Sequence, residues 1–286
     1  MGNTLVVAEK EFKDLLSDRI LLVIVSAFLL YILVDLNNIR NLLDAGFFLK
    51  DPSVTQNNPA ANLAQTMLNQ ITFMLSRYGA ILGIAVGFLS IAGERHGGAL
   101  NALAVKPLRR ETIIVGKTVG ALGFLVCVFT LASAFITSGL LILAANTIAP
   151  VIGEFLARVP AAILTALLYT AVFFFLSMLI SLLIDNYAFA LILSLLAWSV
   201  SGLLATYAFA GYIATFLGDE KGLGSLIVSL SPDGMIKNIS YNALTNFNLD
   251  LWGCLDRMGP ETFKLAAIVI VLLVLSFVAF QRRDIA

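Results

Sequence analysis

The tripeptide Gly116-Lys117-Thr118 has the composition that closes a phosphate-binding loop, in which backbone N–H groups and a lysine hold nucleotide phosphates. That motif needs another glycine five residues before Gly116, and Glu111 stands there instead. It also needs a preceding β-strand, whereas Lys117 lies at the start of a long apolar run. The sequence therefore predicts no nucleotide site in this chain.

The other reactive side chains do not form a catalytic or metal-binding set. His96 is the single histidine, with no cysteine near it, and a metal site needs several ligands. Cys127 lies within an apolar run and Cys254 in a predicted outer loop, where it would be a free thiol. Ser177 and Ser181 are expected to donate hydrogen bonds to carbonyls of their own helix. We predict no catalytic residue, no metal ion and no bound cofactor in this chain.

Residues 93–117 form a polar, basic segment between two long apolar runs. Leu100 and Leu103 are spaced to share one face of a short helix, and Pro107 must end that helix. We interpret residues 94–112 as a loop outside the membrane; an ordinary basic cytoplasmic loop is the alternative. Its distinctive residues are an acid, a glycine pair, two leucines, a proline and a basic pair: Glu94, Gly97, Gly98, Leu100, Leu103, Pro107, Arg109 and Arg110.

This set of residues, followed by Gly116-Lys117, resembles the signature of ABC-2-type permeases. It departs from the family in one place, because Gly97-Gly98-Ala99 replaces a Gly-Thr pair after the acid. The resemblance implies that the loop between the second and third membrane helices carries a coupling helix, which docks on a cytoplasmic ABC ATPase. It also implies an exporter in the plasma membrane of a prokaryote, with a second permease subunit as a homodimer or heterodimer partner. ATP and Mg²⁺ would then bind to the ATPase and not to this chain.

Two other functions remain open at this point. One is a secondary transporter or channel that uses an ion gradient, and the other is a membrane scaffold or assembly factor without transport activity. The first is disfavoured because no acid or histidine is centred in an apolar span, where a proton relay would need one. Neither alternative explains the segment 94–112.

The composition places the chain in the membrane. Hydrophobic residues make up 59% of its 286 residues and charged residues only 13%, against about 45–50% and about 25% in soluble domains. The formal net charge is zero, so no basic field points to a nucleic-acid partner. We therefore predict an all-α polytopic membrane protein that forms a single domain over residues 1–286.

The apolar runs predict six transmembrane helices, each needing about 20 residues. An amphipathic helix at residues 1–19 precedes them, with Leu5, Ala8 and Phe12 on its apolar face, and is expected to lie among lipid headgroups as an elbow. The first span starts at Ile20 and the second ends near Ala92. The other four occupy the ranges 113–145, 160–184, 188–217 and 263–281.

The distribution of lysine and arginine predicts that both termini are cytoplasmic. The segments 1–19, 94–117, 185–187 and 282–286 carry more of these residues than the longer loops 36–76, 144–159 and 218–262. The longer loops are therefore assigned to the outer side. Within the last of them, Ser231-Pro232-Asp233-Gly234 predicts a turn, followed by a short helix at 235–239.

Two further sets of residues in the spans invite interpretation. Gly79, Gly83 and Gly87 recur every fourth residue and predict a face on which a neighbouring helix can pack closely, preferably within the same chain. Asp35 and Arg77 lie at similar predicted depths in consecutive antiparallel spans, so they are candidates for an ion pair in the outer leaflet. Separate snorkelling to the headgroups is the alternative.

Overall fold

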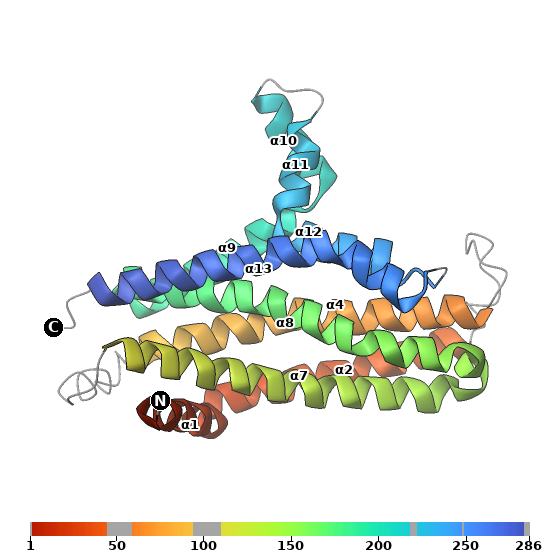
Figure 1. The fold of residues 1–286 in the computed structure, drawn as a ribbon, viewed down its shortest axis with the longest axis horizontal. Helices are drawn as coiled ribbons and strands as arrows, with labels where there is room; N and C mark the ends of the chain where they lie inside the picture. Colours follow the sequence, from red (N-terminus) through yellow and green to blue (C-terminus); the bar gives the residue numbers. More distant parts are fainter. Residues whose placement is uncertain (1, 45–58, 94–109, 218–221, 248, 283–286) are drawn as a thin grey trace.

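The computed structural model describes residues 2–44, 59–93, 110–217, 222–247 and 249–282. All elements in these residues are helices, and no strand occurs among them. Long helices lie side by side along one axis and form a bundle (Figure 1). The elements, in chain order, are α1 (Gly2–Ser17), α2 (Arg19–Asp44), α4 (Pro59–Phe88), the π-helix η1 (Leu89–Gly93), α7 (Arg110–Ile148), the short 3-10 helix η2 (Ala149–Val151), α8 (Ile152–Leu183), α9 (Tyr187–Leu204), α10 (Tyr207–Phe216), α11 (Leu223–Leu230), α12 (Pro232–Ile239), the π-helix η3 (Ser240–Leu244) and α13 (Leu251–Arg282).

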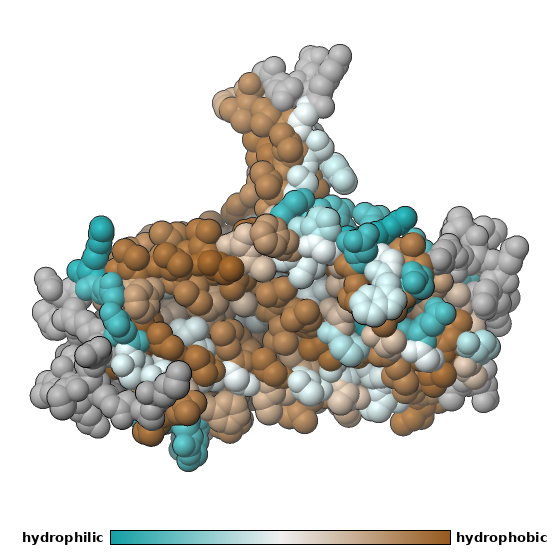
Figure 2. All heavy atoms as spheres, in the orientation of Figure 1, coloured by the Kyte–Doolittle hydropathy of each residue, from teal (hydrophilic) through white to brown (hydrophobic). Residues whose placement is uncertain are grey.

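The prediction of an all-α polytopic membrane protein is confirmed. In the described part of the chain, six helical segments are long and apolar enough to cross a bilayer, and apolar side chains cover much of the bundle surface (Figure 2). These segments are Arg19–Asn41, Ala60–Gly93, Glu111–Ala144, Ala149–Leu183, Tyr187–Leu204 and Leu251–Arg282.

The helices are longer than the apolar runs that revealed them, so the predicted loops 36–76 and 144–159 are wrong as loops wherever they are described. Helix α2 continues to Asp44 and α4 already begins at Pro59. Helices α7 and α8 are separated by η2 alone. Charged or polar residues end a hydropathy window but do not end a helix whose face is still packed. Leu63, Met67 and Ile71 of α4, for example, are at most 1% exposed and recur at helical spacing.

The predicted fifth span, 188–217, is broken. Helix α9 ends at Leu204, and Thr206 takes an extended conformation before α10 begins. The Thr206 hydroxyl donates to the Leu203 carbonyl at 2.6 Å, a local bond that competes with continued helix. Helices α10 and α11 then form a hairpin that projects from the bundle (Figure 1). Its Tyr207, Tyr212 and Phe216 side chains are largely exposed.

The predicted outer loop 218–262 is also mostly helical where it is described. Ser231 caps α12, because its hydroxyl oxygen accepts a hydrogen bond from the Gly234 N–H at 3.1 Å. Pro232 follows at the first helical position, which suits its fixed φ and missing N–H. The predicted turn is therefore the start of a helix, and α12 lies against the long helices of the bundle (Figure 1).

A buried arginine holds the connection between η3 and α13. The side chain of Arg158 is 1% exposed and donates to the carbonyls of Leu244, Asn246 and Leu249 at 3.0, 2.9 and 2.5 Å. Its guanidinium also lies 4.3 Å from the centroid of the Phe247 ring. Because arginine offers five donors in a rigid fork, it can bond to several carbonyls of one turn at once.

Helices α4 and α8 pack closely through the glycine stripe. A Cβ atom built on Gly83 would lie 2.7 Å from the Thr170 carbonyl oxygen, and one built on Gly87 would clash with the Phe174 carbonyl. Gly79 faces Thr170 and also Phe129 of α7. Ser177 of α8 donates across the same interface to the Ile84 carbonyl at 3.0 Å. The expectation that Ser177 bonds to its own helix is therefore wrong, because the close approach exposes a carbonyl of the neighbouring helix to it.

Replacing Gly83 by leucine should destabilise the bundle, since the new side chain meets backbone that no rotamer change can move. Overpacking of this kind costs about 1–3 kcal/mol. We expect the midpoint of thermal unfolding in detergent to be lower than that of the parent protein. Size-exclusion chromatography of heated samples measures this midpoint. The control is Gly259→Leu in α13, where an added Cβ meets no atom within 4 Å. Equal midpoints for the two variants would contradict the packing described here.

Candidate functional sites

One candidate site is the end of the bundle at which α1, the last turn of η1, the first turn of α7 and the end of α13 all lie (Figure 1). The residues predicted to couple to an ATPase connect η1 to α7. Glu94, Gly97, Gly98, Leu100, Leu103, Pro107 and Arg109 lie outside the described residues, and Arg110 begins α7. Their proposed role therefore stays a prediction, but the helices on either side are placed.

Helix α1 is fixed to α7 by a buried ion pair. The Lys117 Nζ atom donates to the Glu11 Oε2 atom at 2.7 Å, and the two side chains are only 2% and 6% exposed. Glycines on α7 allow this close approach, because a Cβ built on Gly120 would lie 2.5 Å from the Ala8 carbonyl oxygen. Phe12 and Phe124 complete the contact with an edge-to-face ring pair at 6.2 Å.

The sequence analysis found α1 but missed this contact. It predicted an apolar face of Leu5, Ala8 and Phe12, whereas the structure buries Glu11 beside Ala8 and leaves Leu5 exposed. The four-residue spacing of Gly116 and Gly120, the small-residue pattern noticed in α4, was the available signal. The placement of α1 among lipid headgroups, as an elbow helix, stays a prediction.

The predicted ion pair between Asp35 and Arg77 does not form in this structure. No ion pair within 4.0 Å joins these two described residues. The Arg77 guanidinium instead lies 5.6 Å from the ring centroid of Phe73, on its own helix, and lines a cavity. The prediction used only the similar depth of the two residues in the membrane. Depth does not determine how each helix is rotated about its axis, and the rotation of α4 turns Arg77 towards that cavity.

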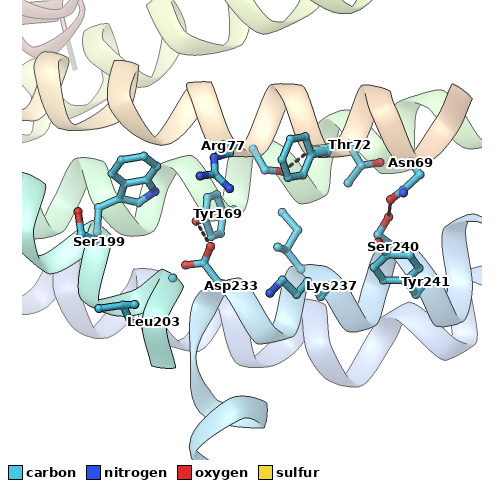
Figure 3. Close-up of a pocket in the computed structure, with 15 residues that line it drawn as sticks. Asn69, Thr72, Arg77, Tyr169, Ser199, Leu203, Asp233, Lys237, Ser240 and Tyr241 are labelled. Atoms are coloured by element: carbon cyan, nitrogen blue, oxygen red, sulfur yellow. Dashed lines mark hydrogen bonds between the residues drawn. The ribbon is translucent and has the colours of Figure 1, made fainter. Parts of the chain in front are cut away.

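The second candidate site is this cavity, which has a volume of about 490 Å³ (Figure 3). Helices α4, α8, α9 and α12 and the π-helix η3 contribute its walls. Its polar lining gathers three charged residues and several hydroxyls and amides, while aromatic and aliphatic side chains form the rest. The lining residues are Asn69, Thr72, Phe73, Ser76, Arg77, Tyr169, Trp198, Ser199, Gly202, Leu203, Asp233, Ile236, Lys237, Ser240 and Tyr241.

Asp233 is held in place by hydroxyl groups from two helices. The Tyr169 hydroxyl donates to Oδ1 at 2.9 Å and the Ser201 hydroxyl to Oδ2 at 2.6 Å. On the other side of the cavity, the Ser240 hydroxyl donates to the Asn69 Oδ1 atom at 2.7 Å (Figure 3). These bonds tie α12 and η3 to α4, α8 and α9, so the cavity has fixed walls.

The sequence analysis missed Asp233 and Lys237 as site residues, because it assigned both to an outer loop. The helix-start residues Ser231 and Pro232 were visible, but only tertiary packing turns α12 inward. Among the described residues, no group of three histidine, cysteine or carboxylate side chains is arranged to hold a metal ion. The polar groups of the cavity are suited to binding a ligand by charge and hydrogen bonds.

The fold defines a multi-pass membrane protein with a cavity that is lined by both charged and aromatic side chains. The family model described as "ABC-2 family transporter protein" matches residues 5–285, almost the whole chain. The chain therefore belongs to the ABC-2 transporter family, and it is of the permease type and not the ATPase. A comparison with curated proteins found no match.

Removing one partner of the Glu11–Lys117 pair should leave the other charge buried between α1 and α7 without this ion pair. Glu11→Leu or Lys117→Met alone should each cost about 3–5 kcal/mol of stability, while the double variant should recover most of it. Thermal unfolding of the four proteins gives the double-mutant cycle. Lys13→Met serves as the control, because its bond to Glu9 is exposed and should matter little. Additive losses in the double variant would mean that the pair does not couple the two helices.

Proposed function

We propose that this chain is the permease subunit of an ATP-driven exporter, moved by a separate cytoplasmic ABC ATPase that docks on residues 94–112. The transporter would contain two permease subunits, identical or different, in the plasma membrane of a prokaryote with both termini inside. ATP and Mg²⁺ would bind only to the ATPase. Family membership supports the permease role and disfavours a gradient-driven carrier or a scaffold.

The observation that carries the coupling proposal is the arrangement around the ends of the segment. Residues 94–109 connect η1 to α7, and α7 is locked to α1 through the buried Lys117–Glu11 pair. A movement of residues 94–109 would therefore be transmitted on one side to α7, together with α1, to which α7 is bound. On the other side it would reach α4, which is a wall of the cavity.

Helix α4 offers a direct mechanical route from the ATPase to the cavity. Arg77 lies 16 residues from Gly93, which is about 24 Å at the rise of an α-helix. The π-helix η1 lies between the segment and the α-helical part of α4. Local π-helices often occur at functional sites in helices. A shift or rotation of α4, driven by ATP binding to the partner, would change the position of Arg77 relative to Asp233 and Lys237 on α12.

The test is co-purification of the ATPase with a permease that carries Leu100→Asp and Leu103→Asp. These changes place charge on the apolar face that is expected to enter a groove on the ATPase. We expect the permease to insert normally but to lose the ATPase and its transport activity. Asn101→Asp adds a charge off that face and should keep both. Undiminished co-purification of the ATPase with the double variant would overturn the proposed docking.

A further inference from the structure

The cavity between α4, α8, α9 and α12 contains two cationic side chains without an acidic partner. No carboxylate of the described residues lies within 4.0 Å of the Arg77 guanidinium or the Lys237 amino group. Within the described part of the chain, the Arg77 guanidinium contacts the Phe73 ring, and Lys237 donates to the Ala205 carbonyl at a long 3.5 Å. Both side chains line the cavity, and Figure 3 shows Arg77 above Asp233 and Lys237 beside it.

Asp233 does not neutralise these two charges. Each of its carboxylate oxygens accepts a short hydrogen bond, from Tyr169 and Ser201, and neither oxygen lies within 4.0 Å of the charged nitrogen atoms of Arg77 or Lys237. Two cations against one carboxylate leave the cavity with a net positive charge. Ionisable groups within a membrane are costly and are normally paired or engaged with a substrate. The missing partner is therefore an anion.

The remaining walls show that this anion is carried by an apolar molecule. Phe73, Trp198, Leu203, Ile236 and Tyr241 line the cavity beside the charged groups. Phe73 is 49% exposed and Tyr241 63% exposed, so the aromatic side of the cavity is open. A small hydrated anion would leave these surfaces without contact, whereas an acyl chain or ring system would cover them.

The depth of the cavity fits a molecule that lies in the bilayer. Arg77 is about 24 Å along α4 from Gly93, in a hydrocarbon core of about 30 Å. Helix α9 has 18 residues, so it rises about 27 Å before it ends beside the cavity. The charged groups are therefore close to headgroup level in the leaflet opposite the chain termini, where an amphiphile carries its polar head.

We propose that this cavity binds an amphiphile with an anionic head and an apolar tail. Arg77 and Lys237 hold the acidic head, a phosphate or carboxylate, and the aromatic residues contact the tail. The proposal rests on the proposed transport function, because it names the class of molecule that the permease would move. Arg77 is on α4 and Lys237 on α12, so movement of α4 would separate the two cations and release the head.

Tryptophan fluorescence can report binding at this site. The chain has two tryptophans: Trp198 lines the cavity, and Trp252 is exposed at the start of α13. In the Trp252→Phe variant, Trp198 is the single reporter. The full-length protein in phosphatidylcholine nanodiscs is titrated with 1-oleoyl lysophosphatidate, with 1-oleoyl lysophosphatidylcholine, which has the same tail, and with inorganic phosphate.

We expect a saturable change in Trp198 fluorescence with lysophosphatidate and none with the other two probes. Arg77→Gln and Lys237→Gln should each weaken binding about ten-fold or more, because each removes a charge-assisted hydrogen bond. Arg77→Lys should bind within about three-fold of the parent, and Arg257→Gln on α13, outside the cavity lining, should change nothing. Thermal unfolding of each variant separates lost binding from lost folding. A Trp198→Phe protein, which keeps Trp252, measures the background of lipid partitioning.

Any of the following results would overturn the proposal. Equal binding of the zwitterionic probe would remove the role of charge, and tight binding of inorganic phosphate would remove the role of the tail. No saturable response, or binding that survives both Gln substitutions, would place any ligand elsewhere. The titration needs neither ATP nor an ATPase. A permease that retains its ATPase but fails this test would keep the proposed transport function and lose only the substrate class.

Discussion

The close approach of α4 and α8 is the constraint on which the rest of the structure depends. In a bilayer, apolar surfaces gain little by leaving lipid for each other, so helices are held by dispersion contacts and by hydrogen bonds between them. Gly83 and Gly87 let the α4 backbone touch the α8 backbone, and Ser177 bonds across the contact to Ile84. This pairing fixes Arg77 and Tyr169 on neighbouring walls of the cavity. Helices α9 and α12 then close the cavity around them.

Four positively charged side chains that are buried or line the cavity differ in the partners that surround them. Lys117 is neutralised by Glu11, and Arg158 is surrounded by three carbonyls and an aromatic ring. Both are fully engaged and serve to fix one element on another. Among the described residues, Arg77 has a ring contact and Lys237 one long hydrogen bond, and neither has a carboxylate within 4.0 Å. That contrast separates the cations that build the protein from those that remain available for a ligand.

The two candidate sites are joined by a single helix. Helix α4 begins beyond the cavity, passes Arg77 and reaches the segment 94–109 through η1. On the other side of that segment, α7 is braced by α1 and contacts Gly79 of α4 through Phe129. The helix that would receive a movement from the ATPase is therefore in direct contact with α8 and α7. Such an arrangement converts a local displacement into a change at the cavity, because packed helices move as rigid units.

The sequence by itself determined the class of the protein, its six spans and the close-packing face of α4, because apolar length and glycine spacing are local properties of the chain. Hydropathy could not give the ends of the helices, since packed faces continue past Asp35 and Arg77 where the apolar run stops. It also could not give helix rotation, so it paired Arg77 with Asp35 and missed the buried contact of Glu11 with Lys117. Only the tertiary structure brought Asp233 and Lys237 into the bundle. Their place depends on α12 docking between helices far away in the sequence, and no spacing within residues 218–262 encodes that contact.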